Sequence, residues 1–210
     1  SGAYIVPVFE RDRSAPPPLV AGLVSSCKES EETGSEITQS LAAKIKNGIV
    51  NLLPETVWGR SDGICITPTM IVMHWSAGAN DDPNGNQKTY DTLVSRNLSC
   101  QLATDINDTW LMERFFEKQV EFPACAGEWN TYSINNEMAG VYFTGNPPPP
   151  NLAELELAYD ATCKVMAQYN IPWSQIYGHY QVPNSAKPDP GVEFLETVFI
   201  PEIKKRCPNG

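Results

Sequence analysis

Apolar residues recur at helical spacing in four stretches of the chain. The first follows Ser35, a suitable N-cap, and stops at Pro54. A short helix is expected over residues 87–97, a long helix after Asn151, and a last helix over residues 192–206. The positions expected to be buried are Leu152, Leu155, Tyr159, Thr162, Met166 and Tyr169 in the long helix, and Leu195, Val198, Phe199 and Ile203 in the last. These stripes indicate packing surfaces rather than sites of chemistry.

Other stretches have the pattern of β-strands. Residues 70–75 are apolar and partly β-branched up to a histidine, as in a buried strand. Residues 98–105 and 109–112 predict a hairpin that turns at Asn107. Residues 133–143 predict a central strand, in which alternation places two sets of side chains on opposite faces. One face carries Ser133, Asn135 and Glu137, and the other carries Ile134, Asn136 and Met138.

The first 35 residues differ in pattern from the rest of the chain. They include Pro16-Pro17-Pro18 and a polar, acidic stretch over residues 28–35. This composition is typical of an extended arm and linker. We therefore expect an arm over residues 1–35 and one domain over residues 36–210, which is long enough for a full hydrophobic core.

The charge balance restricts the kinds of partner. The 210 residues include 25 acidic and 15 basic side chains, for a net charge of -10. This charge disfavours nucleic acid and anionic membranes as partners. No apolar run has the length of a membrane span. We expect binding to depend on the shape of a groove, and we expect the protein to act as a monomer.

Six cysteines leave two alternatives open. They are Cys27, Cys65, Cys100, Cys125, Cys163 and Cys207. No CxxC pair occurs, which argues against a zinc ribbon and a thioredoxin-like redox site. Buried free thiols and disulfides both remain, and we favour disulfides, although the sequence does not choose the pairing. Glycosylation sequons begin at Asn97 and Asn107, a pattern without meaning in a bacterial or phage protein.

One loop near the C-terminus concentrates reactive side chains. Residues 178–191 include His179, Lys187 and Asp189. Proline rings within this stretch exclude a continuous helix, so the segment must fold back on itself. With His74, the second of only two histidines, it provides two imidazoles and a carboxylate, which suffice for a catalytic zinc site. Residue types alone favour an alternative without a metal site, in which His74 is a core residue and His179 a surface residue.

Several segments together resemble one family. Residues 178–194 (Gly-His-Tyr-Gln-Val-Pro-Asn-Ser-Ala-Lys-Pro-Asp-Pro-Gly-Val-Glu-Phe) are similar to the C-terminal zinc segment of the type 2 N-acetylmuramoyl-L-alanine amidases and peptidoglycan recognition proteins. Residues 74–78 (His-Trp-Ser-Ala-Gly) resemble the family's first ligand strand. Residues 130–140 (Asn-Thr-Tyr-Ser-Ile-Asn-Asn-Glu-Met-Ala-Gly) resemble its strand with the catalytic glutamate. Trp58-Gly59 is similar to a pair that precedes the first strand in the recognition proteins.

The resemblance implies an α/β fold with a central mixed β-sheet flanked by helices. It implies a zinc ion held by His74, His179 and Asp189, which activates water for hydrolysis of the amide bond between N-acetylmuramic acid and L-alanine in peptidoglycan. It assigns acid-base catalysis to Glu137 and oxyanion stabilisation to Lys187. It also implies a secreted or extracytoplasmic protein, in a compartment where disulfides form.

The sequence departs from the family pattern near the expected site. Cys100 and Gln101 stand where members usually carry a tyrosine or histidine. Cys125 stands where a histidine is common, and Asn135-Asn136 replaces a frequent Gly-Ile pair. The joint departure suggests a disulfide between the two cysteines, with two unrelated core residues as an equal alternative. The departures also keep a zinc hydrolase of another amide open. A module that binds muropeptides without cleavage is a further alternative, because family members that lack a metal ligand act in this way, but the complete ligand set with Glu137 and Lys187 argues against it.

Overall fold

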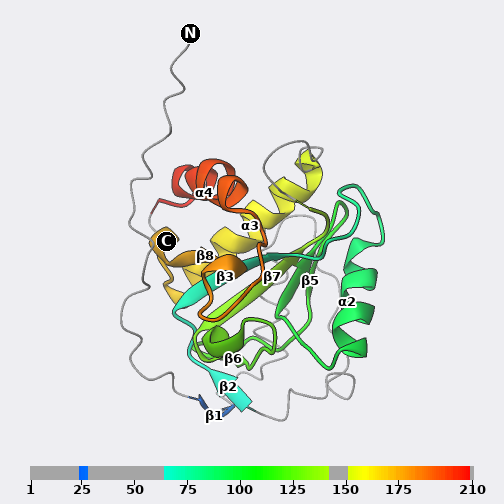
Figure 1. The fold of residues 1–210 in the computed structure, drawn as a ribbon. Coiled ribbons are helices and arrows are strands. Elements are labelled where there is room, and N and C mark those ends of the chain that lie inside the picture. Colours follow the sequence, from blue (N-terminus) through cyan, green and yellow to red (C-terminus); the bar gives the residue numbers. More distant parts are fainter. Residues whose placement is uncertain (1–23, 28–63, 142–150, 209–210) are drawn as a thin grey trace.

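The computed structural model describes residues 24–27, 64–141 and 151–208 (Figure 1). The helix expected before Pro54 and the Trp58-Gly59 pair lie outside the described residues. The domain boundary expected at residue 36 therefore stays a prediction. Within the described ranges, no helix is both long enough and apolar enough to cross a membrane.

A five-stranded mixed sheet forms the centre of the molecule (Figure 1). Its strands, in spatial order, are β5 (Thr109–Leu111), β4 (Leu102–Thr104), β7 (Ser133–Met138), β3 (Met70–Trp75) and β8 (Ile176–Gly178). Strands β4, β7, β3 and β8 are parallel, whereas β5 pairs antiparallel with β4. The mixed sheet, the hairpin and the central strand are thus confirmed. The central strand is shorter than expected, and Gly140 follows it with a φ of 111° that a strand does not adopt.

Helices cover both faces of this sheet (Figure 1). On one face lie α3 (Leu152–Tyr169) and a π-helical segment (Phe194–Phe199) that continues into α4 (Ile200–Arg206). The core on this side includes Ile71, Met73, Ile134, Met138, Leu155, Val165, Leu195, Phe199 and Ile203. On the other face α2 (Gly85–Ser95) contributes Tyr90 and Leu93 to a smaller cluster that contains Ala103. The expected α/β architecture is therefore confirmed.

Two residues of the expected apolar stripes are exposed instead of buried. Leu152 is 78% exposed, because it is the first residue of α3 and precedes the turn that reaches the core. Val198 is 42% exposed and lies within the π-helical segment. A π-helix is wider than an α-helix, so residues three positions apart no longer share a face. Leu195 and Phe199 are both fully buried there, and Val198 is turned toward solvent.

Three disulfides cross-link the described residues, which confirms the expectation that the cysteines form disulfides rather than free thiols. They join Cys27 to Cys65, Cys100 to Cys125, and Cys163 to Cys207. Cys27 follows β1 (Val24–Ser26), which pairs with β2 (Ile64–Ile66) in a second small sheet completed by β6 (Val120–Glu121). A segment of the expected N-terminal arm is therefore attached to the rest of the protein by strand pairing and by a disulfide.

Candidate metal site and active-site cleft

The candidate site lies at the carboxyl ends of three parallel strands, where α/β sheets usually bind ligands. His74 is the next-to-last residue of β3, and Glu137 is the next-to-last residue of β7. The two residues are directly opposite in the register of the parallel pair. His179 follows the last residue of β8, which pairs with β3 on its other side. The sheet thus brings together residues that are far apart in the sequence.

The loop after β8 folds back on itself, as its prolines predict. The backbone N–H of Tyr180 donates to the carbonyl oxygen of Asp189 at 3.1 Å, which holds the two ends of the loop together. The N–H of Gly178 donates to Oε1 of Gln181 at 3.0 Å. A side chain at position 178 would be too close to its neighbours, because a Cβ there would lie 2.4 Å from Cε1 of Tyr180. A glycine at this position lets the loop pack tightly and places His179 beside Asp189.

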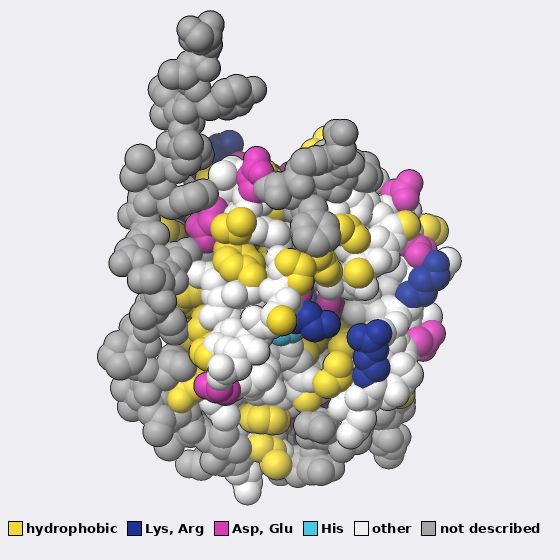
Figure 2. Space-filling view, viewed as in Figure 1, with side chains coloured by type: hydrophobic (Ala, Val, Ile, Leu, Met, Phe, Trp, Pro, Cys, Tyr) yellow, Lys and Arg dark blue, Asp and Glu magenta, His cyan; other side chains and the backbone are white. Residues whose placement is uncertain are grey.

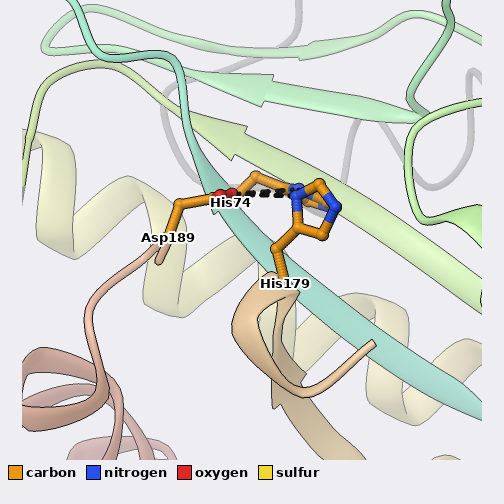
Figure 3. A group of neighbouring side chains, drawn as sticks. All are labelled: His74, His179 and Asp189. Carbon is orange, nitrogen blue, oxygen red and sulfur yellow. Dashed lines mark hydrogen bonds and ion pairs between the residues drawn. The ribbon is translucent and has the colours of Figure 1, made fainter. Parts of the chain in front are cut away.

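The three expected metal ligands point toward one another (Figure 3). Nδ1 of His74 lies 3.0 Å from Nδ1 of His179 and 3.3 Å from Oδ2 of Asp189. The same Asp189 oxygen lies 3.2 Å from Nδ1 of His179. His74 and Asp189 are almost completely buried, and His179 is open to solvent on one side.

These distances fit a tetrahedral zinc site. Zinc bonds to histidine and carboxylate measure about 2.0–2.2 Å, which places ligand atoms of a tetrahedron about 3.3–3.6 Å apart. The three separations between ligand atoms, 3.0, 3.3 and 3.2 Å, lie at or slightly below the lower end of this range. Two imidazole nitrogens and one carboxylate oxygen also form a donor set that zinc prefers. His74, His179 and Asp189 are therefore suited to hold the ion that the family resemblance implies.

The site's charges shift the pKa values of its residues. Burial opposes the charged form of Asp189, but interactions with His179 and His74, whose Nδ1 atoms lie 3.2 and 3.3 Å from its Oδ2, outweigh burial and hold the pKa of this carboxyl well below its usual range. Burial likewise lowers the pKa of His74, whereas the Glu137 and Asp189 carboxylates raise it and prevail. The pKa of His179 is lowered, mainly by burial. Asp189 is thus a permanent anion between two imidazoles.

Glu137 lies beside the ligand group without joining it. Its Oε1 is 3.9 Å from Nδ1 of His74, and its side chain is 12% exposed. Burial raises the pKa of Glu137 to about 7, with Asp189 adding to the rise and the cations of His74 and Lys187 opposing it. Oε1 is also 3.7 Å from Sγ of Cys100, which is bonded to Cys125 and therefore has no proton to donate. The disulfide thus forms an apolar wall against the carboxyl.

A cleft of about 510 Å³ opens onto these residues. One side is formed by residues 75–78, by α2 with Lys88, and by Arg96, which directly follows α2; the other side is formed by residues 187–189. Figure 2 looks into this region, where a small area of histidine surface is visible beside dark-blue basic side chains. Lys88 also pairs with Asp82 outside the cleft lining. Basic groups therefore line a cleft in a protein whose net charge is -10.

All five residues that the sequence suggested lie in this one region. His74, His179 and Asp189 form the ligand group, and Glu137 and Lys187 line the same cleft. Their roles stay predictions. Sequence reasoning did not foresee the basic residues of α2, nor the hydrogen bond of 2.9 Å between Nε2 of His74 and Oδ1 of Asn135. The only signal for the latter was an unusual polar pair on the central strand.

Comparisons with known proteins identify the family of this chain. The family model described as N-acetylmuramoyl-L-alanine amidase matches residues 66–192. Peptidoglycan recognition protein 4 from Mus musculus is 24% identical over 201 residues, which cover 80% of this chain and 50% of that protein. The chain therefore spans about half the length of this curated relative.

Solved structures share the fold at low sequence identity. PlyL has a TM-score of 0.54 at 17% identity, covering 73% of this chain and 94% of PlyL. The catalytic domain of PlyG has a TM-score of 0.54 at 20% identity, covering 74% of this chain and 92% of that domain. A mutant endolysin from Bacillus subtilis has a TM-score of 0.53 at 18% identity, covering 74% of this chain and 99% of the endolysin. Because the family model matches more than half of the residues of this chain, the chain belongs to the N-acetylmuramoyl-L-alanine amidase family.

Proposed function

We propose that the protein is a zinc-dependent enzyme that hydrolyses the amide bond between N-acetylmuramic acid and L-alanine in peptidoglycan. The observation that carries this proposal is the convergence of His74, His179 and Asp189 with the buried carboxyl of Glu137 in one open cleft. Catalytic zinc sites use three protein ligands and keep a further position for water or substrate. Membership of the amidase family supports the reaction class, and the name of the mouse relative supports peptidoglycan as the substrate class.

Glu137 is the group placed to move protons in this reaction. Zinc at the site supplies Lewis acidity, which activates water and polarises the amide carbonyl. The Glu137 carboxylate accepts a proton from the attacking water. It then delivers that proton to the nitrogen of L-alanine as the carbon–nitrogen bond breaks, so the enzyme returns to its starting state. Burial raises the pKa of Glu137 to about 7 in the metal-free protein, and a bound cation would lower it again. A carboxyl whose pKa lies between its usual value and neutrality can both accept and donate a proton.

Basic side chains suit the charge that develops in the reaction and the charge of the substrate. Lys187 lines the cleft near Glu137, where its ammonium group stabilises negative charge on the amide oxygen. Arg96 and Lys88 extend the α2 side of the cleft. Their positive charges attract the carboxylates of a stem peptide despite the acidic character of the whole protein.

We also propose that the protein acts outside the cytoplasm, as a monomer, with its catalytic domain over residues 36–210. The three disulfides support an oxidising compartment. Peptidoglycan, the proposed substrate, supports the same location.

Two other functions compete with the amidase proposal. Similarity to a peptidoglycan recognition protein supports a module that binds muropeptides without cutting them, but such a module has no need for Glu137 beside a complete ligand group. The second is a zinc hydrolase that acts on another amide, and the departures at Cys100, Gln101 and Asn135-Asn136 keep it open.

The test is mass spectrometry of purified peptidoglycan digested with the zinc-loaded protein. We expect free stem peptides that begin with L-alanine. Glu137→Gln keeps the size of the side chain and removes its basicity, so it should bind zinc normally and release less than about one hundredth of the product. Zinc binding without product on any wall type would overturn the amidase proposal in favour of a recognition module or another amide substrate.

A further inference from the structure

Two amide side chains are buried beneath the candidate metal site. Gln101 precedes β4 and Asn135 lies in β7, and both are 0% exposed. Strands in the middle of a parallel sheet are usually apolar, because both faces are covered. A buried amide without partners destabilises the fold, so a pair of amides in this position needs a compensating network of hydrogen bonds.

The two amides are bonded to each other and to the backbone. The backbone N–H of Asn135 donates to Oε1 of Gln101 at 2.8 Å, and Nδ2 of Asn135 approaches the same oxygen at 3.3 Å. Nδ2 also donates to the carbonyl and hydroxyl oxygens of Ser133, at 3.2 and 3.0 Å. Nε2 of Gln101 donates to the carbonyl oxygens of Glu121 and Ser133, at 3.2 and 3.3 Å. Every donor of the two side-chain amides thus has an acceptor in reach.

This network fixes which end of each amide faces which neighbour. A backbone N–H can only donate, so the atom of Gln101 that faces the N–H of Asn135 must be oxygen. That oxygen only accepts, so the nearby side-chain atom of Asn135 must be nitrogen. The remaining atom of the Asn135 amide, Oδ1, therefore faces Nε2 of His74 at 2.9 Å.

The same logic determines the proton position on His74. Because Oδ1 of Asn135 only accepts, Nε2 of His74 must carry the proton. A neutral imidazole has one protonated nitrogen, so Nδ1 presents its lone pair. Nδ1 is the atom that meets His179 and Asp189 in the ligand group.

We propose that Gln101 and Asn135 form a positioning relay that holds His74 with Nε2 protonated and Nδ1 directed at the metal. The proposal rests on the proposed zinc function. Neither amide is itself a metal ligand: Asn135 bonds to His74, and Gln101 acts on His74 only through Asn135. Partners that orient a metal-binding histidine are typically worth about 10–100-fold in metal affinity. Both residues stand at positions where the sequence departs from the family pattern, so the relay is a feature of this chain.

Zinc affinity, measured by competition with a chelator, is the first test. Asn135→Leu removes the acceptor for His74 and keeps the branching of the side chain, and we expect a dissociation constant about 10–100-fold higher. Gln101→Met does not touch His74 but frees Asn135 to rotate, and we expect about a tenfold rise. The matched control is Asn136→Leu, which makes the same change at an equally buried amide on the opposite face of β7, where the partner is Thr104. It should leave the affinity within about threefold of the parent, even if it destabilises the fold.

A second test is independent of metal and of substrate. In metal-free protein with ¹⁵N-labelled histidine, at a pH where both imidazoles are neutral, NMR correlations through two bonds report which nitrogen of His74 is protonated. We expect the Nε2 proton of His74 to exchange slowly with solvent in the parent and in Asn136→Leu. In Asn135→Leu we expect this proton to exchange faster, because its acceptor is gone. Protonation at Nδ1 in the parent would overturn the relay. So would equal losses of zinc affinity in Asn135→Leu and Asn136→Leu, which would indicate a merely structural role. A parent that holds this tautomer and binds zinc but does not cleave peptidoglycan would contradict only the amidase proposal.

Discussion

At the scale of single residues, burial next to opposite charges determines which groups can react. Glu137 and Asp189 are carboxyls in one cleft, yet their pKa values move in opposite directions. Burial opposes the charge of Asp189, but its contacts with His179 and His74 outweigh burial and favour its charged form. Glu137 has no such donors among its described contacts, so burial dominates and its proton is held more tightly. One carboxyl is thus suited to ligation and the other to proton transfer.

The pKa of Glu137 gives the direction of the pH dependence. In the metal-free protein this pKa is raised from 4.5 to about 7. A cation at the neighbouring ligands favours the carboxylate and lowers the pKa again. Because the reaction needs the carboxylate, we expect kcat/KM of the zinc enzyme to fall about tenfold per pH unit below an inflection that lies under pH 7. A pH–rate profile, beside a ¹³C NMR titration of Glu137 in metal-free protein, checks both values. An inflection above pH 7 in the zinc enzyme would contradict the assignment.

At the scale of elements, the loop after β8 determines where His179 and Asp189 lie. Gly178→Ala would introduce a Cβ 2.4 Å from Tyr180 and 2.9 Å from Pro190, so the loop must shift. We expect at least about a tenfold loss of zinc affinity with the sheet intact, because metal sites tolerate little displacement of a ligand. Isothermal titration with zinc and a far-ultraviolet spectrum provide the two readouts. Gly78→Ala is the matched control, since its Cβ would have an ordinary contact of 3.5 Å with Ser76. Unchanged affinity in Gly178→Ala would show that the loop yields without moving its ligands.

The elements also show how far the sequence could predict this protein. Local patterns were sufficient for β3, β7, the hairpin and the long helix, because alternation and helical spacing are properties of neighbouring residues. They failed for Val198, where the helix widens, since the spacing assumes a regular α-helix. The grouping of His74 with the loop after β8 came from the family resemblance. Local sequence patterns do not predict which strands are neighbours in the sheet, and this grouping depends on the pairing of β3 with β8. The hydrogen bond between Asn135 and Gln101 could not be predicted either, because it depends on the pairing of β4 with β7.

At the scale of the whole molecule, one disulfide joins two helices, which strand pairing cannot connect. Cys163–Cys207 connects α3 to the end of α4 across 44 residues and lies away from the cleft lining. Replacing both cysteines by alanine releases this loop in the unfolded state, and we expect the free energy of unfolding to fall by about 2–4 kcal/mol. Urea denaturation measures the loss, and zinc affinity at low urea should stay unchanged. A loss below about 1 kcal/mol would show that packing of α4 on α3 suffices without the bond.

His74 and Glu137 are opposite each other only in the native register of β3 and β7. Side chains alternate along a strand, so a slip of one residue would turn His74 to the face covered by α3. A molecule paired in that way could not assemble the ligand group. The ratio of bound zinc to protein in a purified sample would therefore count correctly paired molecules and serve as a measure of its native fraction.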